Sequence, residues 1–238
     1  MEPTASDYFG ALVREYDSLI RRAVPRYDEL MERLVAYLPP LPAGRRRVLE
    51  LGCGTGNYSL LLADHGRRRW PDLKLTLVDA ASQMLDVTRA RLAEVGRADD
   101  AFVCARFEKL DFAPGSFNLV TSCISVHHVA DKPALFTRLA RLLAPDGELL
   151  IGDQMRGGTE RAHAQNWQRW LAFCRARCSV AEAVSLIDHA YAHDHYESVA
   201  AHFRALARAG YVDVDCVWRN WMWGVVAARV PSEAAGGA

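Results

Sequence analysis

Short apolar runs alternate with longer segments of helical length along most of this chain. The runs lie at 48–51, 74–78, 102–104, 117–122 and 149–152, and runs of this kind are consistent with buried strands. Strands that alternate with helices are typical of a parallel sheet with helices on both faces. The pattern therefore predicts an α/β fold with a doubly wound, mostly parallel, Rossmann-like sheet.

Helical segments are also expected before and after this core. Two helices are predicted over about 7–24 and 27–37, because proline at position 25 disfavours helical backbone at the residue before it. A further helical insert, from about 159 to 193, precedes a last helix that Ser198 begins and Gly210 ends. We expect one domain over 1–238, in which segments 1–38 and 155–197 form a lid over the active site.

Composition is consistent with a single enzyme domain. Lys plus Arg and Asp plus Glu both number 29, so no net charge attracts nucleic acid or a membrane surface. No run approaches the roughly 18 apolar residues of a spanning helix, and the N-terminus lacks the core of a signal peptide. Six irregularly spaced cysteines indicate reduced thiols. These features predict a cytoplasmic protein without membrane contact and disfavour nucleic acid as a partner.

The segment 48–57 carries the strongest chemical signal. An apolar strand includes Glu50 and is followed by three glycines at intervals of two, namely Gly52, Gly54 and Gly56. Because glycine has no Cβ, such a turn lets the backbone approach a ligand closely, at the strand end where open α/β sheets bind nucleotides. A dinucleotide loop would place its third glycine where Asn57 stands. The preceding acid suits a cationic, phosphate-free ligand better than a pyrophosphate.

The next strand, 74–78, ends at Asp79, whose carboxylate can accept hydrogen bonds from both hydroxyls of a ribose. On these residues the chain resembles the class I S-adenosylmethionine-dependent methyltransferases. Further segments are similar to the family's successive motifs, in the same order: 50–56, 78–85, 107–112, 116–120, 142–151 and 206–211. The resemblance extends over about 8–229 and implies a seven-stranded sheet and the cofactor S-adenosyl-L-methionine.

The resemblance also implies which residues hold the cofactor. Glu50 is expected to orient its methionine end and Asp79 its ribose. The expected contacts are Tyr27, Glu50, Gly52, Cys53, Gly54, Gly56, Asp79, Ala80, Met84, Arg106, Phe107 and Cys123. One position departs from the family, which commonly has an acid that accepts the adenine amino hydrogen where this chain has Arg106. A guanidinium only donates hydrogen bonds.

The segment 22–27 is similar to carboxy-S-adenosylmethionine synthase, and Tyr27 is carried over from that resemblance. The synthase holds its additional carboxylate with an arginine in the insert, where this chain has Ile187 beside Asp188. Because an aspartate repels a carboxylate, we expect ordinary methyl transfer from S-adenosylmethionine.

The activated methyl group leaves the protein mainly to align donor and acceptor, and a base is needed only for an acceptor protonated at neutral pH. His127 and His128, after the fourth strand, are the candidate catalytic residues, with a packed structural pair as the alternative. The expected substrate contacts in and after the insert are Trp167, Tyr191, His195 and Tyr196. We predict a small organic acceptor, methylated at O, N or C, and leave a homodimer open.

Other interpretations remain open from sequence alone. A tRNA or protein methyltransferase would need a basic or extended docking face, whereas the arginine runs 45–47 and 67–69 are better explained as solvated surface. A noncatalytic cofactor-binding subunit would keep Asp79. No metal site is predicted, because a pair such as Cys174 and Cys178 is commonly apolar packing. The histidines around 189–195 are open to a role in substrate or metal contact.

Overall fold

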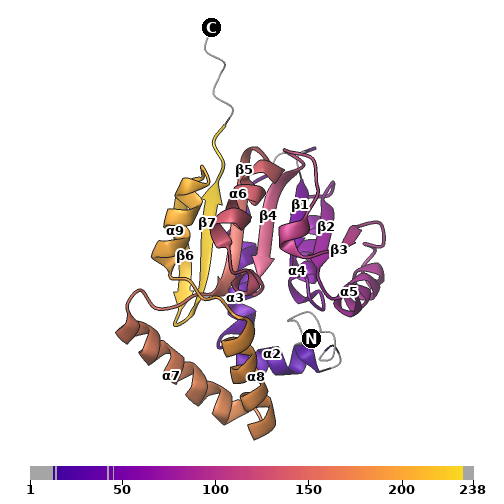
Figure 1. Cartoon of the computed structure of the whole chain (residues 1–238). Helices are drawn as coiled ribbons and strands as arrows, with labels where there is room; N and C mark the ends of the chain where they lie inside the picture. Colours follow the sequence, from indigo (N-terminus) through magenta and orange to yellow (C-terminus); the bar gives the residue numbers. More distant parts are fainter. Residues whose placement is uncertain (1–12, 14, 42, 45, 233–238) are drawn as a thin grey trace.

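The computed structural model describes residues 13, 15–41, 43–44 and 46–232. A seven-stranded sheet of order β3-β2-β1-β4-β5-β7-β6 forms its centre (Figure 1). Neighbouring strands are parallel from β3 to β5, and β7 is antiparallel to both β5 and β6. The strands are β1 Arg47–Leu51, β2 Lys74–Asp79, β3 Ala101–Cys104, β4 Phe117–Cys123, β5 Leu143–Gln154, β6 Val212–Asn220 and β7 Trp223–Arg229. The predicted fold class is confirmed.

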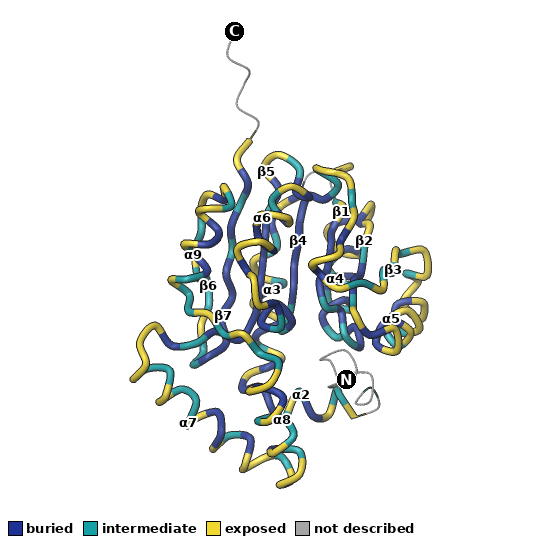
Figure 2. Tube along the Cα trace, viewed as in Figure 1, coloured by how far each residue is buried: buried dark blue, intermediate teal, exposed yellow. Residues whose placement is uncertain are grey.

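Helices pack on both faces of the sheet, because alternate strand residues point to opposite sides. Val48 of β1 belongs to an apolar cluster with α3 and α4, whereas Leu49 and Leu51 belong to a second cluster with α6 and α9. The central strands β1 and β4 are buried along almost their whole length (Figure 2). The helices of this core are α3 Tyr27–Ala36, α4 Asn57–Arg69, α5 Ser82–Glu94, α6 Lys132–Leu142 and α9 Val199–Arg208.

The ends of α9 follow the predicted signals. The Ser198 side chain accepts a hydrogen bond from the backbone N–H of Ala201 at 3.2 Å, which satisfies one of the free donors at the helix start. Gly210 follows the helix with φ +89°, in the left-handed conformation that commonly ends helices.

Three further helices lie at the end of the molecule to which the parallel strands point (Figure 1): α2 Tyr16–Ala23, α7 Glu160–Arg177 and α8 Val180–His193. The indole N–H of Trp170 in α7 donates to the carbonyl of Ala23 at 2.9 Å. The guanidinium of Arg22 donates to both carboxylate oxygens of Glu182 in α8, at 2.8 and 2.7 Å. Helices α7 and α8 therefore brace α2.

The predicted helical segments 7–24 and 159–193 correspond to α2 and to the α7–α8 pair, except that residues 7–12 and 14 lie outside the described residues. The lid function of these segments stays a prediction. None of the helices in the described ranges combines the length and the apolar character that crossing a bilayer requires.

Candidate cofactor and acceptor site

A cleft lies at the carboxyl ends of the central parallel strands. It holds about 810 Å³ of space outside the atoms, part of which is open to solvent. Its walls come from α2, the glycine-rich loop, the tip of β2 with the start of α5, a short helix η1 (Phe107–Lys109) and the loop after β4. The lining residues are Tyr16, Gly52, Gly54, Asp79, Ala80, Ala81, Met84, Arg106, Phe107, Glu108, Ile124, Ser125, His128 and Val129.

Gly52 lies where the loop after β1 packs against the loop after β4. Its φ is +67°, and its N–H donates to the carbonyl of Val78 at 2.8 Å. A Cβ at this position would lie 2.3 Å from Cβ of Ser125. Only glycine fits both the backbone conformation and the space, so the backbone forms this part of the cleft wall.

Asp79 connects the tip of β2 to the glycine-rich loop. One carboxylate oxygen accepts from the N–H of Gly54 at 2.9 Å, and the other accepts from the N–H of Ala81 at 2.9 Å. Burial raises the pKa of Asp79, although these backbone donors oppose the rise. Each carboxylate oxygen has two lone pairs, so the side chain can also accept from the hydroxyls of a ribose.

Glu50 is buried beside the start of the loop, with 1% of its surface exposed. Its Oε2 has no hydrogen-bond partner among the residues that the structure describes. Burial raises the pKa of Glu50 to about 8. A buried polar atom without a partner is costly, and a cationic ammonium group near the loop would offset that cost. This residue fits the methionine end of S-adenosylmethionine, although it does not itself line the cleft.

The part of the cleft where the sequence analysis places the adenine has an apolar wall and one ion pair. Met84, Phe107 and Val129 supply the apolar surface. Arg106 lies 3.3 Å from a carboxylate oxygen of Glu108, and both side chains reach solvent. Glu108, which the sequence analysis missed, lines the cleft and offers the acceptor that Arg106 lacks. The sequence could have indicated Glu108, because it lies two residues after Arg106 and within the segment 107–112 that resembles a family motif.

The tyrosine that lines the cleft is Tyr16, not the predicted Tyr27. Tyr27 is buried at the start of α3, where its hydroxyl accepts from the side-chain amide of Asn57 at 3.3 Å. Tyr16 of α2 lies opposite Gly54, where an added Cβ would come 3.8 Å from the tyrosine ring. The helix that begins after Arg26 turns Tyr27 into the core, so its expected contact with the cofactor has no support from the cleft's lining.

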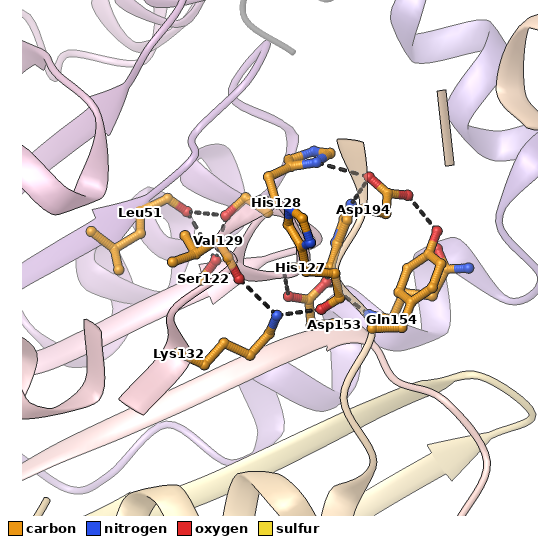
Figure 3. A network of polar contacts seen from close by, with 12 residues as sticks. Leu51, Ser122, His127, His128, Val129, Lys132, Asp153, Gln154 and Asp194 are labelled. Atoms are coloured by element: carbon orange, nitrogen blue, oxygen red, sulfur yellow. Dashed lines mark hydrogen bonds and ion pairs between the residues drawn. The ribbon is translucent and has the colours of Figure 1, made fainter. Parts of the chain in front are cut away.

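The two histidines after β4, in a short helix η2 (Val126–His128), have different surroundings (Figure 3). His128 lines the cleft. His127 is buried, and its Nδ1–H donates to Asp153 Oδ1 at 2.5 Å while its backbone N–H donates to Asp153 Oδ2 at 2.7 Å. The predicted pair is therefore divided between one residue at the cleft and one residue behind it.

The electrostatics of the two imidazoles differ as well. Burial and the neighbouring His127 lower the pKa of His128. Burial also disfavours the charged form of His127, but the charges of Asp153 and Asp194 outweigh it and raise the pKa of His127. Burial works against the ionised form of Asp194 too, and the two histidines reverse this effect and lower its pKa.

The four predicted substrate contacts are not among the cleft's lining residues. Trp167 packs on Trp170, with ring centroids 4.8 Å apart, and Tyr191 is 73% exposed. The hydroxyl of Tyr196 donates to Asp194, and the backbone N–H of His195 donates to the carbonyl of His127 at 2.8 Å. The insert packs on α2 and on the histidine pair, which keeps these side chains out of the cleft.

The predicted cofactor contacts divide in the same way. Those that line the cleft are Gly52, Gly54, Asp79, Ala80, Met84, Arg106 and Phe107. Those outside the lining are Tyr27, Glu50, Cys53, Gly56 and Cys123. Gly56 instead forms the N-cap of α4, with φ +85°. Buried Cys53 donates its N–H to Val78 at 3.1 Å. Gly56 and Cys53 thus shape the loop, and the contacts predicted between the five residues and the cofactor stay predictions.

Sequence analysis also missed two buried carboxylates near the histidines. Asp153 lies at the end of β5, and Asp194 follows α8; their side chains are 1% and 5% exposed. Asp153 carried a signal, because it directly follows the predicted fifth strand, where side chains face the ligand crevice. No local sequence pattern indicated Asp194 as a site residue, since only the folding of the insert brings it to the loop after β4.

Comparisons with known proteins find similarity to methyltransferases. Residues 48–147 match the family model described as a methyltransferase domain. The chain is 33% identical over 133 residues to the malonyl-[acyl-carrier protein] O-methyltransferase of Halorhodospira halophila, covering 53% of this chain and 43% of that enzyme. It is 22% identical over 224 residues to the carboxy-S-adenosyl-L-methionine synthase of Desulforapulum autotrophicum, covering 91% of this chain and 87% of that enzyme.

The fold is also found in a solved structure of Haemonchus contortus phosphoethanolamine N-methyltransferase 2 with phosphomonomethylethanolamine and S-adenosylhomocysteine. The TM-score is 0.67 at 15% identity, over 98% of this chain and 62% of that chain. The chain spans less than half the length of the Halorhodospira relative. Together the matches confirm the resemblance to S-adenosylmethionine-dependent methyltransferases and support S-adenosyl-L-methionine as the cofactor.

Proposed function

We propose that this chain, which carries a methyltransferase domain over residues 48–147, transfers the methyl group of S-adenosyl-L-methionine to a small organic acceptor at O, N or C. One observation carries the proposal. A glycine-rich backbone wall, the strand-tip acid Asp79 and the imidazole of His128 line the same cleft. The cofactor-binding features and a polar group suited to an acceptor therefore share one space.

The residues around the loop would hold the cofactor, which supplies an activated methyl group when it is bound. Asp79 would accept from the ribose hydroxyls, and Glu50 would offer its unpartnered Oε2 to the ammonium group. Phe107 and Met84, which line the cleft, would pack on the adenine, and Glu108 would accept from its amino group. The protein's contribution is mainly alignment, which can lower a barrier by about 7–11 kcal/mol.

The acceptor would lie against the wall formed by the loop after β4. Ile124, Ser125, His128 and Val129 give this wall an apolar surface with two polar groups, as small-molecule pockets commonly have. Tyr16 covers the cleft from α2, and the α7–α8 pair braces that helix. A braced helix over the cleft favours an enclosed small acceptor over a polymer, which would need an open path.

The carboxy-S-adenosylmethionine synthase is the second candidate, because its relative aligns with 91% of this chain. That enzyme's product carries an additional carboxylate. Among the described cleft-lining residues Arg106 is the one cation other than a histidine, and it pairs with Glu108. Asp188, in the insert, is exposed. The charge around the cleft thus favours methyl transfer.

The six free cysteines accord with our placement of the protein in the reducing cytoplasm.

The test is release of S-adenosylhomocysteine from S-adenosylmethionine with a panel of small phenols, amines and enolisable carbonyl compounds, with bulk RNA as a parallel sample. We expect turnover with at least one small acceptor and none with RNA. Turnover with RNA alone would contradict the proposed acceptor class. No turnover with any sample despite cofactor binding would favour a noncatalytic subunit.

A further inference from the structure

Three potential metal ligands from two distant parts of the chain converge beside the cleft. His127 and His128 come from η2 after β4, whereas Asp194 follows α8 (Figure 3). One ligand atom of each lies within 4.8 Å of the other two. We propose that these three side chains bind a divalent transition-metal ion of the Zn²⁺ type.

The distances suit such an ion. Asp194 Oδ1 lies 2.9 Å from Nδ1 of His128 and 3.7 Å from Nε2 of His127, as the dashed lines in Figure 3 show. Zinc binds imidazole nitrogen and carboxylate oxygen at about 2.0–2.2 Å, which places two ligands of a tetrahedral ion about 3.3 Å apart. The two observed separations lie on either side of that value, so modest side-chain rotation completes the site.

A second set of buried groups orients the ligands. The Nδ1–H of His127 donates to Asp153 at 2.5 Å, which leaves the lone pair on Nε2, the atom that faces Asp194. Tyr196 donates to Oδ2 of Asp194, so Oδ1 is the carboxylate oxygen that faces the two histidines. A metal-bound histidine commonly donates its other N–H to a carboxylate in this way. This support distinguishes the cluster from a chance meeting of polar side chains.

The local charge also accommodates a cation. With neutral imidazoles, Asp153 and Asp194 contribute two negative charges. Lys132 contributes one positive charge, and its Nζ donates to the carbonyls of Val129 and His195. One negative charge therefore remains. His189 lies at the edge of the cluster, with Nε2 3.7 Å from Asp194 Oδ1, and is not one of the three proposed ligands.

The position of the cluster assigns it a role toward the acceptor, and this role, unlike the binding itself, rests on the proposed function. His128 lines the cleft, and its buried Nδ1 faces Asp194, so an ion held there would lie directly behind the acceptor wall, within reach of an acceptor that enters between the side chains. Three protein ligands leave a coordination position open, as in catalytic zinc sites. An acceptor with a phenolic hydroxyl or an enolisable carbonyl would coordinate there through oxygen and release its proton to solvent more readily.

The experiment uses the full chain without a histidine tag, treated with a chelator and then titrated with Co²⁺ in the absence of S-adenosylmethionine. We expect one equivalent of Co²⁺ per chain with visible d–d absorption, and displacement by Zn²⁺. Asp194→Asn and His128→Ala should abolish the absorption, and Asp153→Asn should weaken affinity by about 10–100-fold. His163→Ala, which changes a histidine of α7 outside the cluster, is the matched control and should bind as wild type does.

Two results would overturn the metal site. One is the absence of stoichiometric binding by the wild type. The other is a site that survives Asp194→Asn but is lost on Cys174→Ser, which would place the ion on the thiols. Should the cluster variants fail to fold, X-ray absorption of the wild-type Co²⁺ complex decides between a nitrogen and oxygen shell, as proposed, and a sulfur shell. Metal binding without acceptor turnover would count against the proposed function alone.

Discussion

The carboxylate of Asp17 in α2 accepts a hydrogen bond from the hydroxyl of Thr55 in the glycine-rich loop. The same carboxylate accepts from the side-chain amide of Asn57 at 2.9 Å and from the guanidinium of Arg91 at 3.1 Å. Helix α2 is therefore fastened to the loop that forms the cleft wall. Tyr16, the adjacent residue, is held over the cleft by this contact.

We predict that Asp17→Ala weakens binding of S-adenosylmethionine. Hydrogen bonds to a charged group contribute about 1.5–3 kcal/mol each, so partial loss of loop order should reduce affinity by roughly tenfold or more. Asp28→Ala is the control, since its exposed ion pair with Arg21 lies in the same N-terminal region and such pairs contribute little. Calorimetry that gives equal affinities for the two variants would refute a role for Asp17 in loop order.

Gly52→Ala should abolish cofactor binding. The new Cβ would lie 2.3 Å from Ser125, which forces apart the two loops that form the cleft wall. Gly96→Ala is a matched control, because Gly96 also has a positive φ, +78°, but has open space around it. Both variants carry the backbone strain. If Gly52→Ala binds S-adenosylmethionine as tightly as Gly96→Ala does, the close approach at Gly52 has no importance for the site.

Glu50 should make the cofactor-free protein less stable as pH rises. Burial raises the pKa of Glu50 from 4.5 to about 8, so between these values the unfolded chain releases a proton that the folded chain keeps. Stability then falls with rising pH, by up to about 1.4 kcal/mol per pH unit. Glu50→Gln removes the titrating group and should flatten this fall.

Urea unfolding at pH 5, 6.5 and 8 measures the effect. The stability of Glu50→Gln relative to wild type should increase with pH, whereas the exposed control Glu94→Gln should parallel wild type. A constant difference between Glu50→Gln and wild type across this range would show that Glu50 is ionised in the folded protein.

The cofactor that copurifies with the protein should be plain S-adenosylmethionine or its homocysteine product. Asp188 is exposed in the insert and Arg106 is paired with Glu108, so the cleft offers no dedicated partner for an additional carboxylate among the described residues. Mass spectrometry of the extracted ligand identifies the form. Carboxy-S-adenosylmethionine as the main species would instead support the synthase.

Local patterns predicted residues at two successive strand ends, each followed by a turn and a helix, that line the cleft. Gly52 and Asp79 were identified because a strand end, a glycine spacing and an acid are visible in short windows of sequence. Sequence did not distinguish Tyr16 from Tyr27, because both belong to predicted helices, and only the packing of α2 and α3 shows that Tyr16 lines the cleft. The predicted contact between Tyr27 and the cofactor stays a prediction.

The histidine–carboxylate cluster was beyond local patterns for a similar reason. His128 and Asp194 are 66 positions apart in sequence, and their contact depends on how the insert packs beyond the carboxyl ends of the parallel strands (Figure 1). The same packing explains why Trp167 and Tyr191, predicted as substrate contacts, face the insert's own aromatic residues or solvent. Apolar surface indicates that a segment packs, but not which neighbour it packs on.

The affinity of Asp79→Ala for S-adenosylmethionine, measured by calorimetry, tests most directly that the cleft is the cofactor site. The change removes the expected acceptors for both ribose hydroxyls, at about 1.5–3 kcal/mol each, so we predict a loss of roughly 100-fold or more. Asp86→Ala, an exposed acid on α5, should bind as wild type does. Unchanged affinity in a folded Asp79→Ala variant would contradict the account.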